Sequence, residues 1–314
     1  MKSVILTSVA LIAPVVLSAA ELQPDQAADF ARCVPAGATV TKIAGDMGFI
    51  EGPVWVKSGG YLVFSDIPND ELKQWKPGGA VTTYRKPSRN ANGNTLDLEG
   101  RLLTCEHSGR RVAVREKDGT VRTVVDAFEG KKFNSPNDVV VHSDGSLWFT
   151  DPEYGLRTNP QTKQREGKEQ AGNYVFRHDP KTGRTTAVVK DFVQPNGLAF
   201  SPDEKKLYVA DSGSPRHIRV FDVGANGTLS NDRVFCTIDQ GGPDGIRVDT
   251  VGRVWSSAGN GVQIFAPDGK RIGKINTPEG AANLCFGGDD GRTLFITARK
   301  SLYAIKVAVT GAAR

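Results

Sequence analysis

Short apolar runs recur along this 314-residue chain, and they are arranged in a repeating unit. In each of six units a first run is followed by a polar or glycine-rich turn and a second run, as at 137–141 and 147–151. The first runs open at Glu51, Asn92, Asn137, Asn196, Asp244 and Ala282, at intervals of 38 to 59 residues. Repeats of about 40–45 residues that contain several short strands are typical of propellers.

Third and fourth apolar runs complete most units, as at 111–115 and 120–125. Asp-Gly dipeptides such as that at 118–119 lie between the runs, and they favour tight hairpins. The pattern predicts an all-β, six-bladed β-propeller of four-stranded antiparallel blades. The sixth unit has only three runs, which end at 302–307, so we expect an N-terminal strand within 38–44 to complete that blade and close the ring.

The composition is that of one globular domain, with 39% hydrophobic and 24% charged residues. We predict a signal peptide at 1–20, an N-terminal extension at 21–37 and the propeller at 38–314. Lys2 precedes an apolar stretch that ends in small residues, as in secretory signals. A membrane anchor is the alternative, but the stretch is short for a span and Pro14 interrupts it. We therefore expect a periplasmic or secreted protein, with no stable membrane insertion after cleavage.

The net charge is +5, and the basic residues are scattered along the chain. No basic run alternates with aromatic residues, and no helix-turn-helix or zinc-finger spacing occurs, so we expect no nucleic-acid partner. The sequence leaves the oligomeric state open.

Four cysteines are present, at 33, 105, 236 and 285, and none belongs to a C-x-x-C pair. A zinc or redox motif is therefore not expected. In an oxidising compartment, a disulfide that involves Cys33 would tether the N-terminal segment. Buried free thiols are the alternative for Cys105 and Cys285, which lie inside predicted strands.

The residues that open the six units are expected to form a ring, because the first strand of each propeller blade lies beside the central channel. Five of the six carry a side-chain oxygen: Glu51, Asn92, Asn137, Asn196 and Asp244. Carboxylate and amide oxygens suit Ca²⁺, Mg²⁺ or Mn²⁺, and clustered carboxylates repel one another unless a cation holds them. A turn at the start of a strand explains any one of these residues, but five at equivalent positions favour a metal site.

A second ring is expected where the second strands end, at Asp66, Glu106, Asp151 and Asp211. These residues either orient the site or hydrogen-bond local backbone. His107 follows Glu106 and is expected to face the same mouth. The G-x-S-x-G, P-loop, G-x-G-x-x-G and H-E-x-x-H signatures are absent from the sequence, whereas metal-assisted hydrolysis needs none of them.

Four ordered motifs resemble the SMP-30/gluconolactonase family of six-bladed propellers: Glu51-Gly-Pro-Val-Trp55, Ser135-Pro-Asn-Asp138, Pro195-Asn-Gly-Leu-Ala199 and Pro243-Asp-Gly-Ile246. The stretch 147–155 is typical of bacterial gluconolactonase-like members. The resemblance implies that Glu51, Asn196 and Asp244 hold one divalent cation, with Asn137 at a fourth position. Ca²⁺ is favoured, and Mg²⁺, Mn²⁺ or Zn²⁺ are alternatives because the metal varies within the family.

The resemblance also implies hydrolysis of a sugar lactone or a related cyclic ester. In the hypothesis that it suggests, the cation polarises the lactone carbonyl and Asp244 acts as the general base for the attacking water, or holds the cation that activates it. The residues expected to bind the substrate are Asn92, Asn137, His107 and Tyr154.

The substrate itself stays open, because Asn134 and Ser135 occupy the stretch where vertebrate members carry an arginine. One alternative is a non-enzymatic propeller that binds a ligand or partner at its rim. Another is an esterase or phosphotriesterase of the same fold. A polar insertion at 158–170 either covers the mouth of the channel or is mobile.

Overall fold

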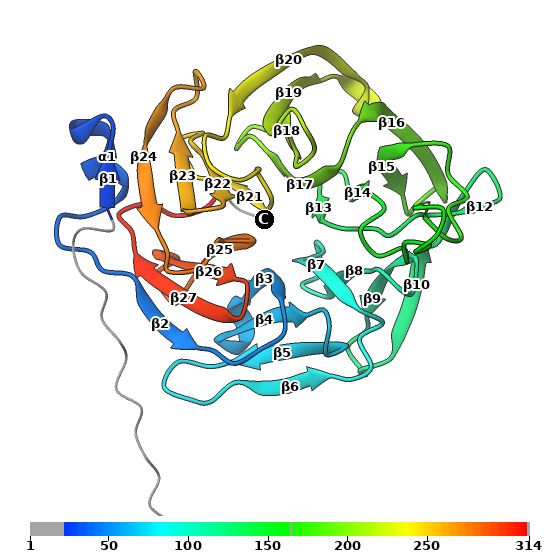
Figure 1. Cartoon of the computed structure of the whole chain (residues 1–314), viewed down its shortest axis with the longest axis horizontal. Helices are drawn as coiled ribbons and strands as arrows, with labels where there is room; N and C mark the ends of the chain where they lie inside the picture. Colours follow the sequence, from blue (N-terminus) through cyan, green and yellow to red (C-terminus); the bar gives the residue numbers. More distant parts are fainter. Residues whose placement is uncertain (1–21, 164, 313–314) are drawn as a thin grey trace, which may run out of the picture.

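The computed structural model describes residues 22–163 and 165–312. Six antiparallel sheets are arranged radially around a central axis (Figure 1), so the predicted six-bladed propeller is confirmed. The signal peptide predicted at 1–20 lies outside the described residues. None of the helices within the described part of the chain is long and apolar enough to span a bilayer.

The blades follow one another along the chain. Blade 1 comprises β3 (Ile50–Val56), β4 (Tyr61–Asp66), β5 (Glu71–Trp75) and β6 (Thr82–Arg85). Blade 2 comprises β7 (Ala91–Leu96), β8 (Leu102–Glu106), β9 (Arg111–Arg115) and β10 (Val121–Val125). Blade 3 comprises β13 (Val139–Val141), β14 (Leu147–Asp151), β15 (Asn173–Asp179) and β16 (Arg184–Phe192).

The second half of the ring repeats this order. Blade 4 comprises β17 (Pro195–Phe200), β18 (Lys206–Asp211), β19 (His217–Val223) and β20 (Leu229–Thr237). Blade 5 comprises β21 (Ile246–Val248), β22 (Val254–Ala258), β23 (Gly261–Phe265) and β24 (Arg271–Asn276). Blade 6 comprises β25 (Asn283–Gly287), β26 (Thr293–Ala298), β27 (Ser301–Lys306) and β2 (Thr41–Ala44). A hairpin of β11 (Ala127–Phe128) and β12 (Lys131–Lys132) lies outside the blades. Within the described residues, 3₁₀ turns at Lys57–Gly59 and Ala225–Gly227 connect β3 to β4 and β19 to β20.

Blade 6 is built from both ends of the chain. β2 pairs antiparallel with β27, with Thr41 opposite Ala304 and Lys42 opposite Tyr303. This pairing satisfies the edge of β27 and confirms that an N-terminal strand closes the ring.

The N-terminal extension joins the propeller as part of a blade. β1 (Leu22–Pro24) pairs with β24 and gives the sheet of blade 5 a fifth strand. Helix α1 (Ala27–Cys33) follows and packs Phe30 against the same strand. A Cβ atom at Gly273 would lie 2.4 Å from the Phe30 ring, so glycine is required at this contact.

The structure contradicts the expected disulfide at Cys33. All four cysteines are free and buried, and the Cys33 thiol donates a hydrogen bond to the Asp29 carbonyl oxygen at 3.1 Å. Strand pairing and the Phe30 contact already hold the N-terminal segment, so no covalent tether is needed.

The hydrophobic core lies between neighbouring blades. One cluster joins Phe149 and Phe176 of blade 3 to Cys105 and Val114 of blade 2. The two rings stack with centroids 5.3 Å apart, and full burial of such a side chain stabilises the fold by about 1.5–3 kcal/mol. The apolar faces of the sheets therefore pack against one another between blades, and polar side chains can occupy the axis.

Candidate functional site

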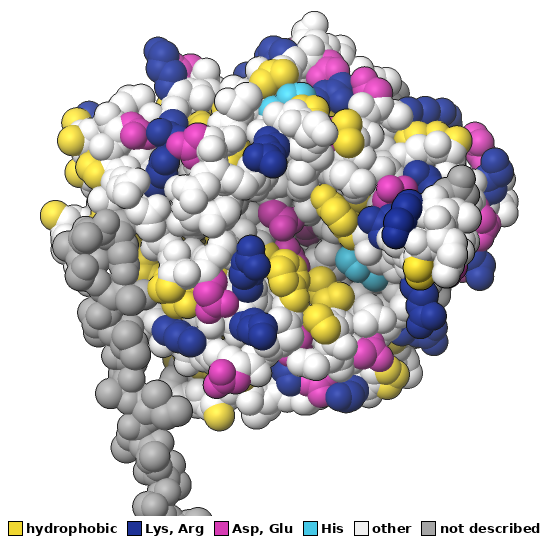
Figure 2. All heavy atoms as spheres, in the orientation of Figure 1, with side chains coloured by type: hydrophobic (Ala, Val, Ile, Leu, Met, Phe, Trp, Pro, Cys, Tyr) yellow, Lys and Arg dark blue, Asp and Glu magenta, His cyan; other side chains and the backbone are white. Residues whose placement is uncertain are grey.

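The first strands of the blades converge on the axis as the repeat predicts. In blades 2, 4 and 5, the residue after the ring member donates its backbone N–H to the carbonyl oxygen of the next ring member along the chain. These bonds join Gly93 to Asn137 at 2.8 Å, Gly197 to Asp244 at 3.0 Å and Gly245 to Ala282 at 2.8 Å. The six positions aligned by sequence are thus neighbours around one channel. Figure 2 shows a hollow near the middle of this face, with acidic side chains inside it and a histidine beside it.

The predicted cation ligands lie on the first strands of the blades or just before those strands. Glu51 lies on β3 and Asn196 on β17, whereas Asn137 and Asp244 precede β13 and β21. Glu51, Asn137 and Asn196 are buried, and Asp244 is half-buried. The structure therefore brings the four residues to one end of the channel, in the arrangement that the repeat implied.

The carboxyl groups at this end of the channel perturb one another. Burial raises the pKa of Glu51 to about 7, and the nearby charge of Asp138 adds to this rise. Burial and the charges of Glu51 and Asp138 raise the pKa of Asp244 well above its usual range. Burial also raises the pKa of Asp138, although Arg247 opposes that change. Three acidic groups therefore share a site in which ionisation of each disfavours that of the others.

A divalent cation fits this group of side chains. Among the described residues, no cluster of three or more His, Cys, Asp and Glu side chains is arranged as a metal site. A cation here would take two carboxylates, from Glu51 and Asp244, and complete its shell with amide oxygens. Asp138 Oδ2 is buried without a hydrogen-bond partner among the described residues, and Arg247 Nη1 lies 3.6 Å away. The surplus of buried negative charge is what a hard cation would offset.

Hydrogen bonds fix the amide of Asn196. Its Nδ2 donates to Ser212 Oγ at 2.9 Å, and Ser212 Oγ donates to the Pro243 carbonyl oxygen at 2.5 Å. The serine therefore links the Asn196 side chain to the backbone just before Asp244. With Nδ2 engaged, Asn196 Oδ1 is the atom that suits a cation.

The expected substrate-binding residues lie beside this group. Asn92 Nδ2 lies 3.1 Å from His107 Nε2, and because an amide nitrogen can only donate, Nε2 is the acceptor. Burial lowers the pKa of His107 to about 4, so the imidazole is neutral near pH 7. A Cβ atom at Gly155 would lie 2.6 Å from His107 Cβ, so the chain after Tyr154 packs directly on the imidazole.

Tyr154 extends from the His107 side of the mouth toward Asp244. Burial and the charge of Asp244 raise the pKa of the phenol to about 12, while hydrogen bonds with Ser212 and Asn196 oppose the change. The side chain is still 41% exposed, so one part of it is open to solvent. Tyr154 therefore lies between the cation ligands and the solvent, where a substrate would enter.

Three aspartates of the second ring hold the backbone that leads into the ligands. Asp151 accepts backbone N–H bonds from Asn134 and Ser135, both at 2.8 Å. Asp66 likewise accepts from Gly48, and Asp211 from Val193 and Gln194. In each blade the bonded segment includes the residue three positions before the ligand. Of the two roles expected for this ring, the aspartates bond local backbone, and in doing so they set the course of the strand that carries the ligand.

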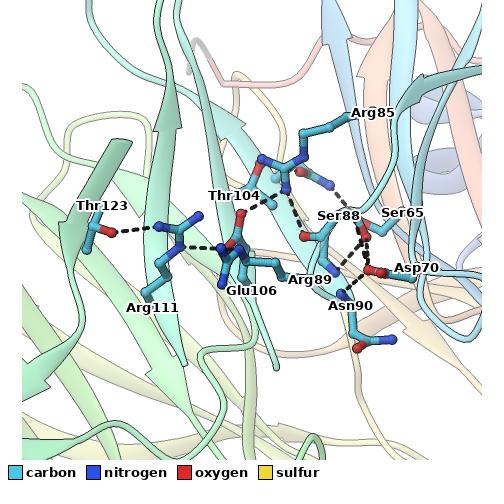
Figure 3. Close-up of polar contacts among 12 residues, drawn as sticks. Ser65, Asp70, Arg85, Ser88, Arg89, Asn90, Thr104, Glu106, Arg111 and Thr123 are labelled. Carbon is cyan, nitrogen blue, oxygen red and sulfur yellow. Dashed lines mark hydrogen bonds and ion pairs between the residues drawn. The ribbon is translucent and has the colours of Figure 1, made fainter. Parts of the chain in front are cut away.

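Glu106, the fourth member of the second ring, pairs with arginines instead (Figure 3). Its oxygens accept from Arg85 Nη2 at 2.9 Å and Arg111 Nε at 2.6 Å, and its side chain is fully buried. The loop before Asn92 is held by Asp70 Oδ1, which accepts from the backbone N–H groups of Ser88 and Asn90 (Figure 3). Asp70, from the β4–β5 turn of blade 1, thus bonds the backbone before Asn92, as Asp66, Asp151 and Asp211 do in blades 1, 3 and 4, while Glu106 pairs with arginines.

The polar insertion after Tyr154 is attached to its surroundings. Gln170 Nε2 donates to the Lys131 carbonyl oxygen at 2.9 Å, and Glu169 accepts from the Lys132 N–H at 2.9 Å. Lys168 Nζ lies 2.8 Å from Glu153 Oε2, beside Tyr154. The insertion therefore supports the Tyr154 segment from the β11–β12 hairpin.

Sequence reasoning missed four residues of the site: Asp138, Ser212, Arg247 and Asn283. Two of them had a signal in the repeat. The position after each ring member is glycine at 52, 93, 197 and 245, but it is Asp138 in blade 3 and Asn283 in blade 6. Glycine occupies the other four of these six positions, so the two polar side chains indicate where side chains fill the channel.

Comparison with known proteins identifies similar sequences and structures. A model of the SMP-30/Gluconolactonase/LRE-like region matches residues 49–300. A gluconolactonase from Zymomonas mobilis is 38% identical over 297 residues, which cover 86% of this chain and 81% of that protein.

Solved structures show the same architecture. A gluconolactonase from Xanthomonas campestris superposes with a TM-score of 0.87 at 34% identity, over 94% of this chain and 97% of that one. A calcium-binding protein, regucalcin, from Agrobacterium tumefaciens has a TM-score of 0.69 at 21% identity, over 86% of this chain and 95% of that one. The latter likeness concerns the fold alone.

Proposed function

Because the chain belongs to the SMP-30/gluconolactonase/LRE-like family, we propose that it is a divalent-metal-dependent lactonase that opens sugar lactones. The observation that carries the proposal is the group of buried carboxylates and amides at one end of the channel. Glu51, Asn137, Asn196 and Asp244 meet there on four different blades. The 38% identity to a gluconolactonase supports a lactone as the substrate class.

These four residues would hold the cation, and their oxygen donors favour Ca²⁺. When bound, such a cation polarises the lactone carbonyl and stabilises the negative charge that develops on its oxygen. The raised pKa values of Glu51 and Asp244 support this assignment, since a cation would keep both groups ionised.

Asp244 is the proposed general base. It is half-buried, so solvent reaches it, and a bound cation would keep its carboxylate ionised and able to accept a proton. The Asp244 carboxylate would take a proton from water as the water oxygen bonds to the carbonyl carbon. The proton would then pass to the ring oxygen as the C–O bond breaks, which yields the open-chain hydroxy acid.

Asn92, Asn137, His107 and Tyr154 would bind the sugar hydroxyl groups. The neutral imidazole of His107 is suited to orient Asn92 through Nε2 and to donate a hydrogen bond from Nδ1, rather than to act as a cationic acid. Tyr154 keeps its phenol proton at neutral pH, because its pKa is about 12, and so it remains a hydrogen-bond donor.

Acid release from glucono-δ-lactone, followed with a pH indicator, tests the proposal. We expect turnover that a chelator removes and Ca²⁺ restores. Asp244→Ala should abolish turnover with the fold intact by circular dichroism, whereas Asp268→Ala, at an exposed turn, should retain it. Full activity of Asp244→Ala would refute the role of this residue.

Substrates of other classes separate the alternatives. Chelator-sensitive hydrolysis of aryl esters or phosphotriesters in place of lactones would identify an esterase or phosphotriesterase on the same site. Cation binding without turnover of any of these compounds would indicate a binding propeller.

We also propose that the protein is exported to the periplasm or secreted, because residues 1–20 have the features of a signal peptide. Sequencing of the N-terminus of the protein recovered outside the cytoplasm tests this, with cleavage near Glu21 as the expected result.

A further inference from the structure

A layer of polar side chains fills the channel beneath the proposed cation ligands. Asn283, the first residue of β25, and Asp138 are 2% and 1% exposed. Asn283 Nδ2 donates to Glu51 Oε2 at 2.9 Å. Blade 6, which has alanine at its ring position, therefore contributes to the site through the next residue.

The orientation of the Asn283 amide is determined by its neighbours. Its Oδ1 accepts the Leu284 N–H at 2.8 Å, so its nitrogen must be the atom that meets Glu51. The same side chain lies beside Asp138, whose pKa it lowers. One amide thus adjoins two buried carboxyl groups, and a donor is the group that both of them require.

Neighbouring blades leave room for this layer. A Cβ atom at Gly245 would lie 2.1 Å from Asn283 Cγ, and one at Gly93 would lie 2.5 Å from Asp138 Oδ1. Any side chain at either glycine would displace the polar residue opposite it. The two glycines therefore hold Asn283 and Asp138 in fixed places in the channel.

Both hydrogen bonds to the Glu51 carboxylate reach the same oxygen. Oε2 accepts from the Gly52 N–H at 2.6 Å and from Asn283 Nδ2. Among the described residues, none donates a hydrogen bond to Oε1, so Oε1 is the oxygen left for a cation. Two donors on one oxygen also fix the rotation of the carboxylate plane.

We propose that Asn283 is a positioning residue of the metal site, which holds the Glu51 carboxylate so that Oε1 serves as the ligand. This inference rests on the metal site of the proposed function. It assigns to blade 6 a role that its ring residue, Ala282, cannot fill.

Calorimetric titration of Ca²⁺ into the chelator-treated protein tests the inference without reference to turnover. Loss of a partner that orients a ligand typically weakens metal binding by about 10–100-fold, so we expect Asn283→Ala to raise the Kd by that factor. Gln263→Ala is the matched control: this buried amide on β23 donates to the Asp239 carboxylate at 2.6 Å, away from the site. Its Kd should stay within about twofold of the wild-type value.

A double-mutant cycle with Glu51→Gln shows whether Asn283 acts through Glu51. We expect Asn283→Ala to add little to the loss already caused by Glu51→Gln, with thermal-shift titration extending the measurement to millimolar Ca²⁺. If the alanine variant does not fold, Asn283→Ser keeps one donor in the layer and should show a smaller loss.

Two results would overturn the inference: wild-type affinity in a folded Asn283 variant, or a full additional loss in the double variant. Failure of the wild-type protein to bind Ca²⁺, or any of Mg²⁺, Mn²⁺ and Zn²⁺, would instead overturn the proposed metal site on which the inference depends.

Discussion

Replacement of Glu51 by glutamine is expected to stabilise the protein in the absence of a cation, although it removes a ligand. Burial raises the pKa of Glu51 from 4.5 to about 7. Since one pKa unit corresponds to about 1.4 kcal/mol, ionisation of Glu51 costs the cation-free fold about 3 kcal/mol. Glutamine keeps an oxygen to accept the Gly52 and Asn283 bonds and carries no charge.

The sign of the pH dependence follows from proton linkage. The folded protein holds the Glu51 proton up to about pH 7, whereas the unfolded chain releases it near pH 4.5. The stability that this proton confers is therefore complete below pH 4.5 and is lost as the pH rises through 7. Glu51→Gln should show no gain at pH 4.5 and a gain of up to about 3 kcal/mol at pH 8, or about 6 °C in Tm.

Thermal unfolding in chelator at several pH values measures this difference. Addition of Ca²⁺ at about 1,000 times its Kd should stabilise the wild-type protein by about 4.1 kcal/mol and reverse the order of the two proteins. Glu99→Gln, at an exposed position, is the control and should match wild type throughout. A glutamine variant that is less stable than wild type in chelator at pH 8 would refute the reasoning, as would a gain that does not change with pH.

Three further substitutions distinguish residues that support the fold or the cation ligands from a residue that binds the substrate. Asp151→Asn replaces one of the two oxygens that accept backbone bonds before Asn137 with an amide nitrogen, which cannot accept, so Ca²⁺ titration should show a higher Kd; an unchanged Kd would contradict the role given to this aspartate. His107→Ala should raise KM while the pH–rate profile keeps its shape between pH 5.5 and 8, because the imidazole is already neutral there; loss of an inflection in that range would contradict this. Glu106→Gln leaves the guanidinium groups of Arg85 and Arg111 without a buried carboxylate, so urea unfolding should show a loss of about 3–5 kcal/mol while Ca²⁺ affinity is kept. A large change in affinity would contradict a purely structural role for Glu106.

The fold and the ring of candidate ligands could be predicted from the sequence because both are periodic. A repeat places equivalent residues at equivalent radii, so Glu51 and Asp244 could be placed together without coordinates. The closure by β2 was predictable as well, since a blade with three strands leaves an open edge.

The supporting residues were harder to predict because their partners lie outside the repeat. Asn283 acts on Glu51 across 232 residues of sequence, and only ring closure brings the two together. The prediction of a disulfide in the N-terminal segment was wrong for a different reason. A cysteine in a short extension suggests a tether, but β1 pairing and the Phe30 contact with Gly273 hold that segment without one.

The closure of blade 6 also determines when the site can form during folding. Glu51 is among the first ring residues to be synthesised, yet its partner Asn283 lies near the other end of the chain. A nascent chain that has not reached β25 can form the early blades, but it leaves the Glu51 carboxylate without this donor. Contacts of such long sequence separation form late and slow the folding of β proteins. We therefore expect the protein to bind a cation only at the end of folding, when the ring closes.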